Sequence, residues 1–194
     1  MAPPIQKKWD TIYQTKSSAT IAAEVLTENL HLLATKQQGL ALEIACGLGA
    51  NSLLLATKGY TVDAWDISPV AIKKLKLNPT FSSNIHPLAC DVMQQAIQEN
   101  HYNLIIVSRF LERSLIPSII KGLKPGGLVF YQTYLQDKAA GSGPNNPRFL
   151  LQKNELLALF SPLSLVVYRE EAQLGNASTG FRNEAMLIAQ KPAS

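Results

Sequence analysis

Short apolar runs alternate with stretches of helical periodicity between residues 40 and 134, and this alternation limits the possible folds more than any other feature. We expect strands at five runs: 40–44, 60–65, 85–89, 102–107 and 128–134. The intervening stretches predict helices: 51–58, 69–77, 92–98 and 111–123. Alternation of this kind predicts an α/β fold, in which a parallel sheet carries helices on both faces.

The flanking segments complete this prediction. Residues 17–35 show the periodicity of an amphipathic helix, and residues 153–160 that of a short one. Two further strands are expected at 163–169 and 184–190, with no helical pattern between them, which predicts an antiparallel hairpin at the edge of the sheet. The segment between 136 and 148 is rich in Gly, Pro and Asn and is expected to be a functional lid loop.

The length of 194 residues predicts one domain over 1–194. We divide it into an amino-terminal cap segment and helix (1–36), a cofactor-binding core (37–134), a lid loop (135–151), and a helix followed by the carboxyl-terminal hairpin (152–194).

Composition and charge argue against several classes of protein. With 46% hydrophobic and 16% charged residues the chain is globular, and its net charge of +4 comes from scattered residues, so no nucleic-acid partner is expected. A secretion signal and an apolar run of ~20 residues are both missing, which predicts a cytoplasmic protein without a membrane partner. Cys46, Cys90 and the three histidines lack metal-ligand spacing, so we expect reduced thiols and no metal.

Gly47 and Gly49 follow the first predicted strand. In a sheet of this kind ligands bind beyond the carboxyl ends of the strands, next to the first one, where glycine lets a ligand approach the backbone. A simple strand-to-helix turn would use the same two residues, so the pair alone does not decide between the two interpretations.

Acidic residues close the next two strands. Asp66 ends the second, where an acid can accept hydrogen bonds from both hydroxyls of a ribose, and Asp91 ends the third. Asp66 could instead cap the helix after Pro69, although Ser68 is well suited to that role.

Dinucleotides and S-adenosylmethionine both contain an adenosine whose ribose could bind such an acid. Two residues help to distinguish between these two kinds of ligand. A pyrophosphate cofactor favours a third glycine, where this chain has Ser52. Glu43 precedes the turn, and at about 6 Å and an effective dielectric of about 20 its charge would contribute about 3 kcal/mol, repelling phosphate and attracting a cation. The ligand is therefore expected to be cationic, as S-adenosylmethionine is.

The runs ALEIACGLGANSLLLATKGYTVDAWDISPVAI, CDV, YNLIIVSRF and LKPGGLVFYQTY together resemble the Rossmann-like S-adenosylmethionine-dependent methyltransferases, most closely their small tellurite-resistance-like and thiopurine-methyltransferase-like members. The resemblance extends from about residue 8 to 191 and implies a three-layer, seven-stranded, mostly parallel sheet with an antiparallel carboxyl-terminal strand. It implies S-adenosyl-L-methionine as the cofactor and leaves the methyl acceptor open.

The resemblance also implies which residues bind the cofactor. Its methionine half would be held by Glu43, Ala45, Gly47 and Gly49, and its ribose and adenine by Asp66, Ile67, Asp91 and Val92. Ser108 and Arg109 would line the methyl-transfer side. Trp9 and Tyr13 match a W-D-x-x-Y segment that closes over the cofactor in the family, although mutual aromatic packing would equally explain their spacing.

Two departures from the family pattern are visible. Ala45 replaces a glycine, which is compatible with the loop if its φ is negative. Ser108-Arg109-Phe110 stands where amino-group methyltransferases of nucleic-acid bases or glutamine carry an [Asp/Asn]-Pro-Pro-aromatic segment, which argues against that reaction.

The catalytic residues are not defined by the sequence. Tyr13, Arg109 and Tyr134 are candidates for orienting an acceptor, and Arg148 in the lid loop could contact an anionic one. The favoured function is in-line methyl transfer to a small molecule, for which a soft sulfur, selenium or tellurium nucleophile would need little help from a base. The alternatives are an NAD(P)-dependent oxidoreductase and a non-catalytic cofactor-binding domain.

Overall fold

A computed structural model describes residues 3–16, 21–33, 39–139 and 141–193. Its strands follow the order β3-β2-β1-β4-β5-β7-β6 in a seven-stranded sheet, which confirms the predicted fold class. The chain divides into two compact units, Met1–Ala96 and Ile97–Ser194, and each is described by itself below. That the chain is one domain stays a prediction.

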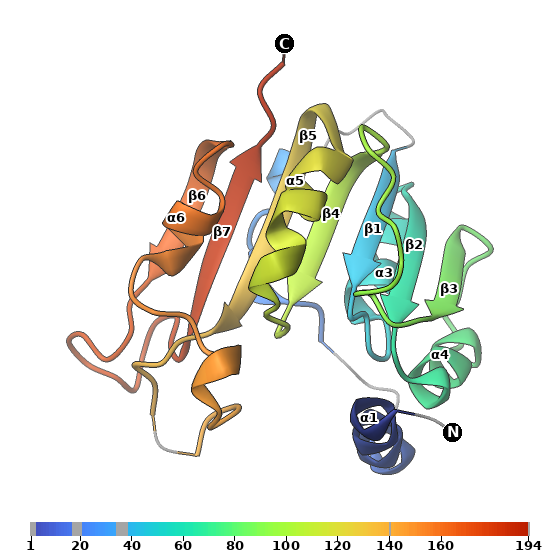
Figure 1. Cartoon of the computed structure of the whole chain (residues 1–194), viewed down its shortest axis with the longest axis horizontal. Helices are drawn as coiled ribbons and strands as arrows, with labels where there is room; N and C mark the ends of the chain where they lie inside the picture. The colour runs from blue at the N-terminus through green and yellow to red at the C-terminus, as the bar shows by residue number, and fades with distance from the viewer. Residues whose placement is uncertain (1–2, 17–20, 34–38, 140, 194) are drawn as a thin grey trace. The chain divides into compact units, whose positions relative to one another are not determined.

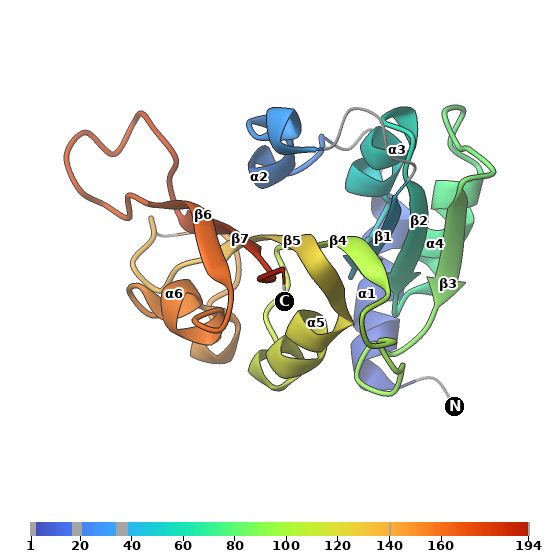
Figure 2. The ribbon, with the colours of Figure 1, turned by 90° about the horizontal axis from the view of Figure 1, so that it is seen from above.

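The first unit contains three parallel strands, which can be followed in Figures 1 and 2. They are β1 (Leu40–Ile44), β2 (Thr61–Asp66) and β3 (Ile85–Ala89). The register pairs Ile44 with Trp65 and Asp66 with Ala89, so the carboxyl ends of neighbouring strands lie at one edge. The helices α3 (Ala50–Thr57) and α4 (Pro69–Lys76) follow β1 and β2.

Local sequence explains why α4 begins where it does. The side chain of Ser68 accepts a hydrogen bond from the Ala71 backbone at 3.2 Å, and Pro69 occupies the first helical position. The buried face of α4 consists of Ala71, Ile72 and Leu75, and it packs on β2 and β3 in one apolar cluster. Ser68 therefore caps this helix as predicted.

The amino-terminal helices differ from the prediction. An unpredicted helix α1 spans Pro4–Thr15. The predicted helix 17–35 lies partly outside the described residues, and the remainder forms only α2 (Glu24–Thr27) and the 3-10 turn η1 (Leu30–Leu32). No helix is present at 92–98, where a turn begins with the Asp91 side chain accepting from the Met93 backbone at 3.0 Å.

The second unit contains the other four strands. They are β4 (Tyr102–Ser108), β5 (Leu123–Tyr134), β6 (Ser164–Glu170) and β7 (Glu184–Gln190). β4 and β5 are parallel, whereas β7 is antiparallel to both β5 and β6, which confirms the hairpin. Its core contains aliphatic and aromatic side chains from β4, β5 and β7, among them Leu104, Ile106, Val129, Phe130 and Ile188.

Two helices lie on the same side of these strands (Figure 2). They are α5 (Ile116–Gly122), which follows the 3-10 turn η2 (Arg113–Leu115), and α6 (Glu155–Leu159). A further 3-10 turn, η3, spans Pro147–Phe149. Both helices are shorter than the predicted stretches 111–123 and 153–160, because Pro117 stands in the first turn of α5 and the left-handed Asn154 (φ 61°) precedes α6. Within the described ranges, no helix has the length and apolar character needed to cross a membrane.

Candidate cofactor site

The turn after β1 is built from left-handed backbone. Ala45 (φ 56°), Gly47 (φ 54°) and Gly49 (φ 76°) all have positive φ. The condition under which an alanine was expected to fit the loop, a negative φ at Ala45, is therefore not met. A β-strand bond from Cys46 N to Trp65 O at 2.9 Å holds the backbone next to Ala45, so pairing with β2 offsets the strain of an alanine in this region.

The two glycines are needed for different reasons. A Cβ on Gly49 would lie 2.5 Å from Cδ1 of Leu75, so this glycine lets the start of α3 approach α4. A Cβ on Gly47 would lie 2.7 Å from the hydroxyl of Tyr13. Gly49 thus serves helix packing, whereas Gly47 keeps open the space that α1 covers.

Asp66 joins the glycine turn to the start of α4. Its Oδ2 accepts from Gly47 N at 2.7 Å, and its Oδ1 accepts from Ser68 N at 2.8 Å. The carboxyl group is buried, and burial raises its pKa, although the two backbone bonds oppose the rise. Each carboxylate oxygen can accept a second hydrogen bond, so Asp66 retains the capacity to bind two hydroxyl groups.

Glu43 is fully enclosed and bonded to the first turn of α3. It accepts from Asn51 Nδ2 at 2.8 Å, from Ser52 N at 2.9 Å and from the Ser52 hydroxyl. Asn51 in turn accepts from Ala23 N at 2.8 Å. Sequence reasoning assigned Glu43 to a ligand only, and it missed this second role in anchoring α3 and the Ala23 backbone.

The ionisation of Glu43 gives a testable pH dependence. Burial raises its pKa from 4.5 to about 7, against the hydrogen bonds from Ser52 and Asn51 that lower it. Because the folded state binds the proton more tightly, the contribution of Glu43 to the free energy of unfolding is fully present below pH 4.5. It falls as the pH rises toward 7, by on the order of 3 kcal/mol.

Urea denaturation at pH 5 and pH 8 should therefore show a smaller loss of stability at pH 8 for Glu43→Gln than for the wild type. Glu24→Gln, at an exposed position of α2, serves as the control and should follow the wild type. Equal pH dependence in all three proteins would show that Glu43 titrates near its ordinary pKa.

Trp9 and Tyr13 stack on α1 with ring centroids 5.7 Å apart. The Tyr13 hydroxyl also lies against Gly47, and burial followed by the charge of Asp66 raises its pKa. The two rings pack on each other, and they do so at the glycine turn. The geometry is therefore compatible both with mutual aromatic packing and with closure of this segment over the cofactor.

The adenine-side residues lie at the ends of β2 and β3. Val92 is buried and Ile67 is half-buried. Asp91 accepts from Met93 N at 3.0 Å and from Gln94 Nε2 at 3.2 Å, so it organises the turn after β3. Its role in binding adenine stays a prediction.

The predicted methyl-transfer residues belong to the second unit. Ser108 ends β4, and Arg109 follows with φ 55°. Arg109 Nε donates to Glu184 Oε1 at 2.8 Å, and Gln132 Nε2 donates to Glu184 Oε2 at 2.6 Å. Glu184 was missed, because a single acid at the start of a strand carries no local signal of a partner so distant in sequence.

Tyr134 and the loop after it lie in the same unit. Tyr134 is opposite Glu184 in the β5–β7 register, and burial, followed by that acid, raises its pKa. A Cβ on Gly143 would lie 2.5 Å from the Tyr134 ring, so the predicted lid loop covers this side chain. Arg148 pairs with Glu112 at 3.3 Å, and its contact with an anionic acceptor stays a prediction.

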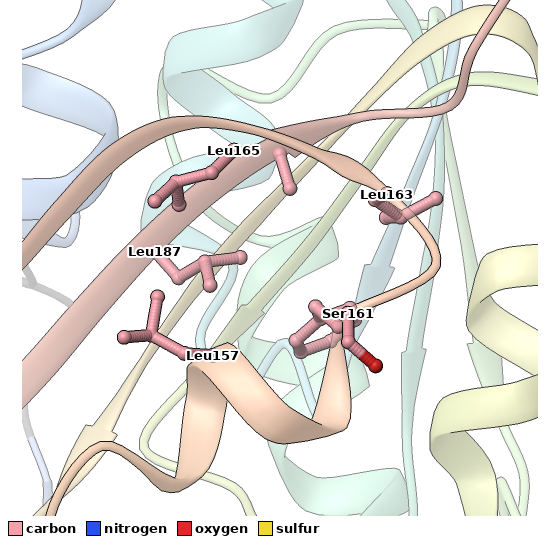
Figure 3. A pocket seen from close by; sticks show the side chains of 7 residues that line it. Leu157, Ser161, Leu163, Leu165 and Leu187 are labelled. Atoms are coloured by element: carbon pink, nitrogen blue, oxygen red, sulfur yellow. The ribbon is translucent and has the colours of Figure 1, made fainter.

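An apolar pocket of about 220 Å³ lies between α6 and the β6–β7 hairpin. Figure 3 shows Leu157, Leu165 and Leu187 pointing into it. None of the predicted site residues lines this pocket. In the part of the chain that the structure describes, Cys46 and Cys90 are free thiols, and no cluster of three potential metal ligands is found.

A glycine turn after β1, a buried acid at the end of β2 and an antiparallel β7 are the features expected of the Rossmann-like methyltransferase fold. A solved structure of a SAM-dependent methyltransferase from Methanosarcina mazei has this fold, with a TM-score of 0.67 at 18% identity over 90% of this chain and 100% of that one.

The family model of tellurite resistance protein TehB matches residues 5–180, and the chain belongs to this family. The expected similarity to the tellurite-resistance-like family is thereby confirmed.

TehB of Haemophilus influenzae is similar to it, both as a curated sequence and as a solved structure. The "Probable S-adenosyl-L-methionine-dependent methyltransferase TehB" of strain KW20 / Rd is 37% identical over 86 residues, which are 43% of this chain and 30% of that protein. The crystal structure of TehB from H. influenzae gives a TM-score of 0.65 at 25% identity, over 94% of this chain and 67% of the other. The matched region is thus under a third of the length of the curated relative.

Proposed function

We propose that this chain transfers a methyl group from S-adenosylmethionine to a small-molecule acceptor. The observation that carries the proposal is the buried Asp66, which is fixed by Gly47 and Ser68 and still able to accept bonds from a ribose diol. When bound, the cofactor supplies a methyl group on a positively charged sulfur. The residues expected to hold the cofactor are those named from the sequence: Trp9, Tyr13, Glu43, Ala45, Gly47, Gly49, Asp66, Ile67, Asp91, Val92, Ser108 and Arg109.

The charge of Glu43 supports a cationic ligand. With a pKa of about 7 this carboxyl is partly ionised at neutral pH, and a positive charge nearby would favour its ionised form. A pyrophosphate would disfavour that form, which argues against a nicotinamide dinucleotide.

The chain's own residues can orient and enclose an acceptor without acting as strong bases. Tyr13 and Tyr134 have raised pKa values, so their hydroxyls stay protonated and can position an acceptor by hydrogen bonding. Arg109 is held in place by Glu184. Alignment of the nucleophile and exclusion of water are then the main contributions of the protein, which suits an acceptor that is a soft nucleophile.

Binding measurements test the cofactor directly. S-adenosylmethionine and S-adenosylhomocysteine should each raise the melting temperature, whereas NAD should not. At a hundredfold excess over Kd the stabilisation is about 2.7 kcal/mol, or a shift of roughly 5 to 10 °C for a chain of this size. A shift with NAD alone would overturn the proposal.

Turnover needs a separate measurement. A panel of small thiols and of selenium and tellurium oxyanions, followed by formation of S-adenosylhomocysteine, should reveal the acceptor. Cofactor binding without product on any member would favour the non-catalytic alternative.

A further inference from the structure

The helix α1 has few stabilising features within its own sequence. None of its residues is buried, its N-cap makes no side-chain hydrogen bond, and its last turn contains no basic residue. A helix of this length is only marginally stable alone. Its position must therefore depend on contacts with the rest of the first unit.

The helix α1 lies beside α4 (Figure 1). The side chains of Lys74 and Ser68 make three hydrogen bonds to α1 and its C-cap residue. Lys74 Nζ donates to the carbonyl oxygens of Gln14 at 3.0 Å and of Lys16 at 2.7 Å. The Ser68 hydroxyl donates to Asp10 Oδ1 at 2.5 Å.

Lys74 places a positive charge at the carboxyl end of α1. The carboxyl end of a helix carries unbonded carbonyls and a partial negative charge, and a cation at that end is stabilising. The last turn of α1 has no basic residue, and the ammonium of its C-cap residue Lys16 lies over the Tyr13 ring, 5.8 Å from the ring centroid. The ammonium that donates to the terminal carbonyls is that of Lys74, from a different helix.

The position of α1 controls what lies over the glycine turn. Tyr13 is on the last turn of α1, close to the carbonyls that Lys74 contacts, and its hydroxyl lies against Gly47. The backbone of Gly47 is bonded in turn to Asp66. A movement of α1 away from α4 would therefore uncover the Gly47 and Asp66 side of the cofactor site.

We propose that Lys74 is a positioning residue that holds α1 closed over the glycine turn, so that its contact with the end of α1 sets the rate at which the adenosine cofactor leaves. This inference rests on the proposed function. Lys74 itself does not contact the reacting atoms; it acts through Tyr13 and the backbone of α1.

The test compares Lys74→Met, which keeps the apolar stem and removes the charge, with Lys74→Arg and with Lys73→Met at an exposed position of the same helix. Dissociation of tritium-labelled S-adenosylhomocysteine is followed after addition of excess unlabelled S-adenosylmethionine. We expect dissociation to be about tenfold faster in Lys74→Met, as loss of a charge-assisted contact implies. Lys74→Arg should restore most of the wild-type rate, and Lys73→Met should match the wild type.

Hydrogen exchange gives a readout that a general loss of stability would not reproduce. With S-adenosylhomocysteine bound, the amides of α1 should exchange faster in Lys74→Met, while those of β1 and β2 should keep their protection. Equal dissociation rates in Lys74→Met and Lys73→Met, or uniform loss of protection throughout the unit, would overturn the inference. Failure of the wild type to bind S-adenosylhomocysteine would instead contradict the proposed function itself.

Discussion

Asp66→Ala is expected to weaken binding of S-adenosylhomocysteine by at least about a hundredfold. Each hydrogen bond between a ribose hydroxyl and a buried carboxylate contributes about 1.5–3 kcal/mol, and two such bonds exceed the roughly 2.8 kcal/mol that a hundredfold change requires. Isothermal titration calorimetry measures the change.

The design of this experiment must account for the structural role of Asp66. Its removal also leaves Gly47 N and Ser68 N without their acceptor, so binding should be measured well below the melting temperature of the variant. Asp66→Asn retains an acceptor oxygen and should give an intermediate loss. Asp63→Ala, on the same strand but partly exposed and paired with His86 at 3.4 Å, should bind normally. Wild-type affinity in Asp66→Ala would remove this residue from the site.

Gly49→Ala should produce the largest loss of stability among the substitutions considered. The left-handed backbone, with φ at 76°, costs about 1 kcal/mol for alanine. The new methyl group would lie 2.5 Å from Cδ1 of the fully buried Leu75, and overpacking of this kind adds about 2 kcal/mol. The free energy of unfolding from urea denaturation should fall by about 3 kcal/mol in total.

Gly59 provides a matched control. It has φ at 88° and no atom within 4 Å of an added Cβ, so Gly59→Ala should lose only the backbone contribution of about 1 kcal/mol. Equal losses in the two variants would show that Leu75 moves aside at no cost and that Gly49 is needed for its backbone alone.

The strands could be predicted from the sequence because each is a continuous apolar run bounded by turn residues. The helices were less predictable. Residues 92–98 contain good helix formers, but Met93 is 49% exposed and the stretch is too short to be helical without a packed face. The helix α1 has the opposite character: none of its residues is fully buried, and part of what holds it comes from Lys74 and Ser68, which lie far along the chain.

The candidate site was predictable where local sequence determines position. Gly47 and Asp66 follow directly from their places at strand ends, and the structure joins them by a hydrogen bond. The bonds from Glu43 to Asn51 and Ser52, and from Arg109 to Glu184, depend on how separate elements meet. Single-residue patterns do not encode such pairs, which is why these roles were missed.

The turn after β1 and the helix that covers it are secured in different ways. The turn is held by strand pairing and by contact with the buried Leu75, whereas α1 has no fully buried residue and is attached by a few hydrogen bonds and by the packing of Tyr13 against Gly47. Substitutions in α1 could therefore alter how quickly a nucleoside exchanges while the shape that recognises it is preserved.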